Sequence, residues 1–174
     1  SSAVAQNVNP LSHLTFALVS AWEKAGQGKT EEAIADLTAT TGANWFELFI
    51  NFNAGLLAEY NNDPRQAAKF YKEAYEIDRG ALRNALSYTR MLAASGRQQE
   101  ALDIIAEYEQ LIPGHPLLVT LREKIESGQV IERAAKTPAE GLAEALHGLG
   151  IAVSKEGEEL SANYLQLAAY LNPN

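Results

Sequence analysis

The sequence predicts an all-α fold, with about nine helices in a single domain over residues 1–174, stacked as antiparallel helical hairpins. Turn-forming residues recur at a spacing of 34 residues, at Gly28, Asn62 and Gly96. Shortly after each of them comes an alanine, and four residues beyond each alanine comes an apolar side chain. These pairs are Ala33 with Leu37, Ala67 with Tyr71, and Ala101 with Ile105. A generic helical bundle with chance spacing is the alternative, and three in-phase copies disfavour it.

The composition fits such a fold and narrows the classes of partner. Hydrophobic residues make up 47% of the chain, which is enough for a core. The net charge of −8 argues against nucleic acid and against an anionic membrane surface, because both bind clustered Lys and Arg. No apolar run has the length of a transmembrane helix, so we expect no membrane insertion and a soluble protein. The chain has no cysteine, which excludes thiol chemistry and disulfides.

The first hairpin is expected over about 10–41. Asn9 and Pro10 fit the cap and the first position of its first helix, which runs roughly to Ala25. Glycines end this helix, and Thr30 begins the second one.

The second hairpin is expected over about 44–78 and starts with the most apolar helix of the chain, at about 44–60. A helix that is apolar on nearly every side is buried on several sides or presents a binding face. Asp63 and Pro64 then cap and begin the second helix of this hairpin.

The later part of the chain departs from the regular period. A third hairpin is expected over about 81–112, and a helix then starts at Pro116. The hairpin at about 115–136 is truncated, because Gln129 to Lys136 is too short and too mixed for a full helix. Thr137-Pro138-Ala139-Glu140 is a capping box, which opens a last hairpin over about 138–173. The first helix of this hairpin is expected to end at about Lys155, and the second to run over about 159–171.

The residue pattern does not predict an enzyme. His13, His115 and His147 are far apart, and none has the spacing of a metal motif, so each is read as a surface or helix-start residue. Gly148-Leu149-Gly150 lacks the third glycine and the preceding strand of a dinucleotide loop. With no nucleophile–base pair in view, we expect no catalytic residue, no cofactor and no metal site.

The 34-residue pattern resembles the tetratricopeptide repeat. Its small first-helix position corresponds to Ala21, Gly55 and Thr89. The resemblance implies a right-handed superhelix of hairpins, an α-solenoid. The segment around Thr137–Gly141 also resembles long proteobacterial tetratricopeptide proteins, which implies a bacterial protein of cytoplasm or periplasm. The only methionine is Met91, so we expect a processed protein or an internal fragment of a longer one.

The resemblance further implies that the first helix of each hairpin lines a concave groove. The groove-facing residues would be Leu18, Trp22, Phe49, Phe52, Asn53, Leu56, Tyr60, Arg83, Leu86, Ser87 and Arg90. Trp22 is expected to be exposed in this groove, whereas Phe49 and Phe52 could equally be core residues. Asn53 could equally bond a neighbouring loop.

Some family members hold the C-terminal carboxylate of a partner with five polar or basic groove residues. Asn53 and Arg83 fit two of these positions, but Leu18, Trp22 and Ser87 do not fit the other three. We therefore do not expect this chain to bind a chaperone tail in that way. An aromatic floor with Arg83 and Arg90 suits an apolar segment with an acidic flank, as an extended peptide or a helix.

These features predict a protein–protein interaction scaffold whose groove binds a partner peptide or helix. One alternative is a structural spacer in a longer array, whose groove is filled by its own chain or by a second copy. The incomplete repeat ends make such a homo-oligomer an option. Another alternative is a regulatory module of an enzyme whose catalytic part is not in this chain.

Overall fold

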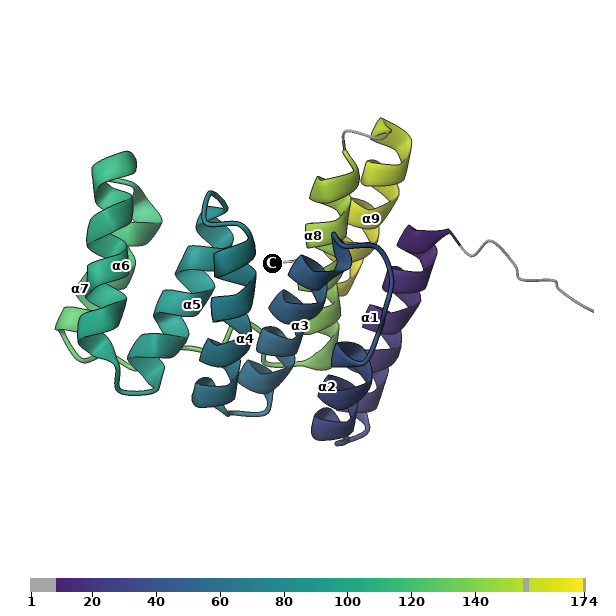
Figure 1. The fold of residues 1–174 in the computed structure, drawn as a ribbon, viewed down its shortest axis with the longest axis horizontal. Helices are drawn as coiled ribbons and strands as arrows, with labels where there is room; N and C mark the ends of the chain where they lie inside the picture. The colour runs from purple at the N-terminus through teal and green to yellow at the C-terminus, as the bar shows by residue number, and fades with distance from the viewer. Residues whose placement is uncertain (1–8, 155–156, 174) are drawn as a thin grey trace, which may run out of the picture.

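A computed structural model describes residues 9–154 and 157–173 of the protein. This part of the chain is all-helical, with nine α-helices and no strand (Figure 1). The helices are α1 (Pro10–Gly26), α2 (Thr30–Thr38), α3 (Phe46–Tyr60), α4 (Pro64–Ile77), α5 (Leu82–Ala94), α6 (Gln98–Leu111), α7 (Pro116–Glu126), α8 (Pro138–Val153) and α9 (Glu158–Leu171). The all-α prediction is confirmed for these residues. The expected end of α8 at about Lys155 lies outside them.

Four helices begin at a capping residue followed by proline. The side chains of Asn9 and Asp63 accept hydrogen bonds from the first turns of α1 and α4. The ring of His115 does the same at the start of α7, so this histidine is a helix-start residue, as expected. Thr137 and Glu140 form the predicted capping box of α8. Such caps satisfy backbone N–H groups that have no partner within the helix.

Four turns between helices share one geometry. The residues that lead out of α1, α3, α5 and α7 have left-handed φ angles: Gly28 (79°), Asn62 (60°), Gly96 (88°) and Gly128 (67°). In each turn the next backbone N–H donates to a carbonyl five residues back, which is the Schellman arrangement. Glycine and asparagine tolerate this conformation, which explains their 34-residue spacing. The turn at Gly128 was not part of that spacing, and it marks α7 as a further helix of the same kind as α1, α3 and α5.

The repeated alanines occupy equivalent buried positions near the start of the second helix of each hairpin. Ala33, Ala67 and Ala101 are all fully buried, and the apolar residue four positions after each is at most 1% exposed. The small residue of the facing helix matters most at Gly55, where an added methyl group would lie 2.6 Å from the ring of Tyr71. Small side chains at these points let the two helices approach closely.

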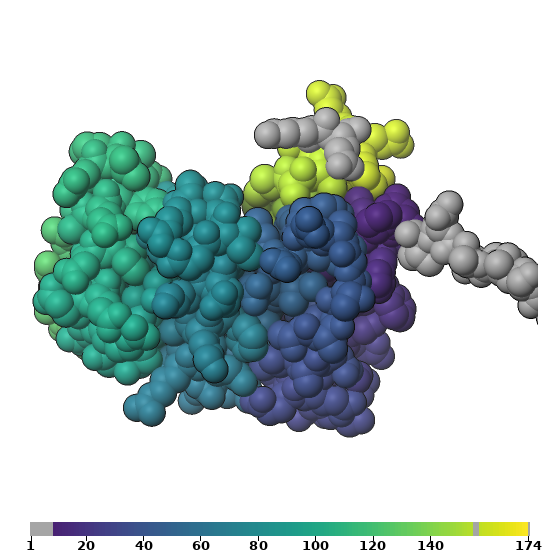
Figure 2. Space-filling view, viewed as in Figure 1, coloured from purple at the N-terminus to yellow at the C-terminus, as the bar shows by residue number. Residues whose placement is uncertain are grey.

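Helices α1 to α7 follow one another in a row, each packed against the next (Figure 1). Residues 129–137, which we call the strap, form no helix. After the strap the chain turns back, and α8 packs against α1 and α3 as well as against α9. In the space-filling view α8 and α9 stand against the N-terminal helices, away from α6 and α7 at the other end (Figure 2). The C-terminal hairpin therefore does not extend the row.

No helix in the described ranges combines the length and the hydropathy needed to cross a membrane.

Candidate functional site

The residues expected to line a groove lie on α1, α3 and α5, on one side of the row that we call the odd-helix face. The structure divides them into two groups. Those at most 8% exposed are Leu18, Trp22, Phe52, Asn53, Leu56 and Ser87. Those that are half-buried are Phe49, Tyr60, Arg83, Leu86 and Arg90. At Trp22 the burial follows from where α8 packs.

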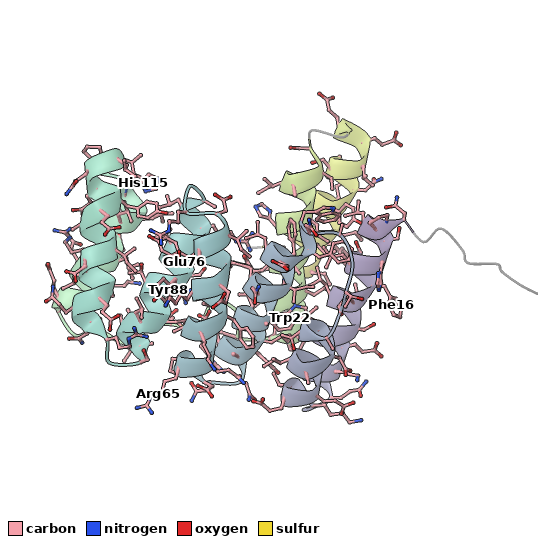
Figure 3. The ribbon with its side chains drawn as sticks, in the orientation of Figure 1. Phe16, Trp22, Arg65, Glu76, Tyr88 and His115 are labelled. Carbon is pink, nitrogen blue, oxygen red and sulfur yellow. The ribbon has the colours of Figure 1, made fainter. Side chains whose placement is uncertain are left out.

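Helix α8 covers Trp22. The indole is 1% exposed, and a methyl group added at Gly141 of α8 would overlap its six-membered ring. Tyr60 packs edge-on against the indole, with ring centroids 5.9 Å apart. In Figure 3 the Trp22 side chain lies among the helices, whereas Phe16 of the same helix points outward. The expectation that Trp22 is exposed in an open groove is therefore wrong. The sequence did not reveal it because Gly141 lies in a distant part of the chain.

Arg83 links three elements on the odd-helix face. Its guanidinium carbon lies 4.5 Å from the centroid of the Phe52 ring, within cation–π range. The same group donates to the Glu144 carboxylate of α8 at 2.5 Å and to the Glu144 carbonyl at 3.2 Å. About one third of each side chain in this ion pair is exposed, at 33% and 39%. Arg83 is thus already engaged by the chain's own acid.

Arg90 is also engaged, through a buried carboxylate that the sequence analysis did not single out. Glu59 of α3 is 2% exposed and pairs with Arg90 at 2.5 Å. It also accepts a 2.7 Å hydrogen bond from the hydroxyl of Tyr71 and another of 2.7 Å from the backbone N–H of Ala134 in the strap. Burial, and then the charge of Glu59, raise the pKa of Tyr71 well above its usual value.

Glu59 therefore joins α3, α4, α5 and the strap. A buried carboxylate is tolerated because three donors compensate for its lost hydration. Arg90 additionally donates to the carbonyl of Glu132, and Arg133 donates to the carbonyl of Tyr60 at 2.9 Å, so the strap is held along its length. The sequence carries one sign of this site, because Glu59 is an acidic residue near the end of a mostly apolar helix. An acidic side chain that is buried there needs hydrogen-bond or ionic partners.

A cavity of about 350 Å³ remains on the odd-helix face between α3, the start of α5 and the second half of α8. Its wall is mainly apolar and includes Phe49, Phe52, Leu82, Gly148 and Ile151, with Arg83 and Asn53 among the polar groups. A second hollow, of about 430 Å³, follows along α5 and is lined by Leu86, Arg90, Leu117 and Ala134 among others. Of the half-buried residues, Phe49, Arg83, Leu86 and Arg90 border this open space, whereas Tyr60 lines neither cavity.

Asn53 is the polar group of the cavity wall whose bonding is incomplete. Its side-chain N–H donates to the Phe49 carbonyl at 2.9 Å, within its own helix. Its carbonyl oxygen Oδ1 is buried and meets no donor among the described residues. The amide therefore bonds its own helix and not a neighbouring loop, and its unused acceptor is buried beside the cavity.

The arrangement of acidic and histidine side chains does not point to a metal centre. Within residues 9–154 and 157–173, no three such side chains cluster at metal-binding distances. His13 and His147 are exposed, and the ring of His13 packs edge-on against Phe46, with centroids 6.0 Å apart. The chemistry that the face offers is apolar contact, stacking on arginine and hydrogen bonding.

Comparison of the sequence with protein-family models gives no match, and comparison with curated proteins gives none either.

Proposed function

We propose that this chain is a protein–protein interaction scaffold, a tetratricopeptide-type superhelical array that binds a partner segment on its odd-helix face. The observation that carries the proposal is the cavity of about 350 Å³ beside α8, with an apolar wall, a stacked guanidinium and an unused amide acceptor. Concave, mainly apolar sites with a few oriented polar groups are typical of ligand recognition.

The partner that fits best is a segment with one apolar anchor side chain. Phe49, Phe52 and Ile151 would surround the anchor, and the Asn53 side chain would have to turn its buried Oδ1 into the cavity to accept a hydrogen bond from the partner. An acidic flank is less important than the sequence suggested, because Glu144 and Glu59 already neutralise Arg83 and Arg90. A partner carboxylate gains Arg83 only by displacing Glu144.

A blocking variant tests the proposal. Ala152 is exposed and lines the cavity, so Ala152→Phe would fill it without disturbing the core. The matched control is Ala162→Phe, at an exposed position of α9 outside the cavity wall. A displayed library of random peptides is selected on the wild-type chain. We expect a related set of peptides with a shared apolar anchor. These peptides should bind the control variant and should not bind the Ala152→Phe variant.

Peptides that bind Ala152→Phe as well as the wild type would rule out this cavity as the site.

A second candidate is the structural spacer whose binding face is filled by its own chain. The packing of α8 over Trp22 favours it, because that contact already occupies the first part of the face. This candidate predicts that the selection returns no related peptides and that the blocking variant behaves as the wild type in every binding assay.

A further inference from the structure

Helix α8 meets the odd-helix face through small residues. At Gly141 an added methyl group would overlap Trp22, and at Gly148 it would lie 3.2 Å from the guanidinium of Arg83. Ala145 lies between them, four residues from one and three from the other, so the three share one side of the helix. Glu144 beside them pairs with Arg83. The face thus accepts a helix with a small-residue stripe and one acid.

Two polar groups of the odd-helix face near α8 are buried and unsatisfied among the described residues. The indole N–H of Trp22 and the Oδ1 atom of Asn53 are both buried without a partner in the described part of the chain. The Trp22 ring lies directly against Gly141, and Asn53 lines the cavity next to Ala145 and Gly148. Buried polar groups without a partner destabilise a contact. A different occupant that supplied an acceptor and a donor would fit this face better than α8 does.

Helix α8 is attached to the row by core residues, Ala145, Leu149 and Val153, and by a peripheral ion pair. Its ion pair with Arg83 is partly exposed, and the strap before it forms no helix. On its other side α8 is tied to α9: a methyl group at Gly150 would lie 2.9 Å from Leu165, and the Ser161 hydroxyl donates to the Gly150 carbonyl at 2.8 Å. The two helices can therefore move together as one hairpin.

We propose that α8 is an intramolecular substitute for a partner helix, which displaces the α8–α9 hairpin from α1, α3 and α5. The partner helix carries small residues at the positions of Gly141, Ala145 and Gly148 and an acid at the position of Glu144. This inference goes beyond the proposed function, because the partner helix takes the place of α8, whereas a cavity-bound segment needs α8 as part of its site.

The chain offers a clean way to lock the hairpin in place. A methyl group added at Gly26, at the end of α1, would lie 3.7 Å from the β-carbon of Pro138, at the start of α8. This is the β-carbon separation of a disulfide, usually about 3.5–4.5 Å. Because the chain has no cysteine of its own, Gly26→Cys with Pro138→Cys can form only this bridge within one molecule.

The probe is a fluorescent synthetic peptide of residues 137–154, which contains α8 and its capping box. Its binding is measured to the full-length double-cysteine variant, reduced and oxidised. The reduced form is expected to bind as the wild type does, and oxidation should weaken binding at least about tenfold, because the competent open state is removed. A full-length Glu144→Arg variant, which loses its own ion pair, is expected to bind the peptide about 3–10-fold more tightly than the wild type.

A peptide carrying Gly141→Leu is the matched control and should not bind, since its side chain would overlap Trp22. Equal binding to the reduced and oxidised forms would overturn the inference, as would binding of the control peptide or no binding to any form, Glu144→Arg included. The cavity peptides separate this outcome from failure of the proposed function. The cavity peptides should bind the oxidised form and should not bind the Ala152→Phe variant. The α8 peptide, in contrast, should bind the oxidised form only weakly.

Discussion

The contacts between the hairpins of the row differ in their residues from the contact between α8 and the row. In the row from α1 to α6, hairpins interlock through fully buried alanines and large apolar residues such as Leu37, Tyr71 and Ile105. At the contact between α8 and the row, glycines face Trp22 and Arg83, an ion pair is partly exposed, and two buried polar atoms are unsatisfied. Apolar burial, at about 25 cal/mol per Å², stabilises both contacts, because Ala145, Leu149 and Val153 of α8 belong to the same buried core as the row.

The two kinds of contact differ in how often they occur in the molecule. Positions repeated at 34-residue spacing are buried in each hairpin of the row. The contact with α8 is made once, from residues outside that period, on the face that the first helices of the hairpins present. The proposed exchange of α8 requires that the row stays folded when α8 leaves it.

The largest effect is expected from the core of the row. Tyr71→Ala removes a fully buried ring at the junction of α3 and α4 and leaves Glu59 without one of its donors. We expect the free energy of unfolding to fall by about 3–5 kcal/mol. Denaturant unfolding followed by circular dichroism measures this loss. Tyr170→Ala, at a side chain that is 84% exposed, is the control and should change it by less than about 0.5 kcal/mol.

A smaller loss is expected at the buried carboxylate that joins the row to the strap. Glu59→Gln keeps the shape of the side chain but leaves Arg90 without its counter-charge and faces the Ala134 N–H with a weaker acceptor. We expect a loss of about 1–3 kcal/mol in the free energy of unfolding. Glu47→Gln, at an exposed position of the same helix, is the matched control. Equal effects of the two substitutions would mean that Glu59 does not join the two regions.

Alkaline pH should lower the stability of the row, because Tyr71 lies in the row and its pKa is raised in the folded state. The unfolded chain releases this proton near pH 10, while the folded chain retains it to higher pH. The stabilisation is therefore complete below about pH 10 and is lost as pH rises toward the folded pKa. For this group the free energy of unfolding should fall by up to about 1.4 kcal/mol per pH unit.

Denaturant unfolding between about pH 9 and pH 11 checks this slope, with Tyr71→Phe for comparison. The variant lacks this titrating group but keeps Tyr75, Tyr88 and Tyr108, whose pKa values burial also raises. Its slope should be shallower than that of the wild type. Identical slopes would show that Tyr71 does not retain its proton in the folded state.

The smallest effect is expected where α8 meets the row. A double-mutant cycle of Arg83→Ala and Glu144→Ala should give a coupling free energy below about 1 kcal/mol, because both side chains are partly exposed. A coupling of several kcal/mol would place the α8 contact among the core contacts of the molecule.

Periodicity in the sequence was sufficient to predict the row. The spacing of Gly28, Asn62 and Gly96 located the turns, and the alanines marked the close approaches, because these features are local and repeat. The truncated hairpin was visible as well, since residues 129–136 lack a helical pattern. The positions of the helices in the described ranges follow from these signals.

The contacts of the odd-helix face could not be predicted in the same way. Gly141 and Trp22 are brought together only by the reversal of the chain at the strap, for which no repeat gives a spacing. The partners of Glu59 come from α4, α5 and the strap, so its burial depends on all of them at once. The exposure of residues on the first helices depends in part on a helix from outside the period, as at Trp22 beneath Gly141.

Native-state hydrogen exchange in low denaturant tests the central claim, that α8 and α9 form a separable unit on a stable row. The account predicts that amides of α8 and α9 exchange through a partial opening of lower free energy than amides of α3 and α4. Oxidation of the Cys variant of Gly26 and Pro138 should close that gap. If α8 and α3 exchange only through the same global unfolding in the wild-type chain, the account is contradicted.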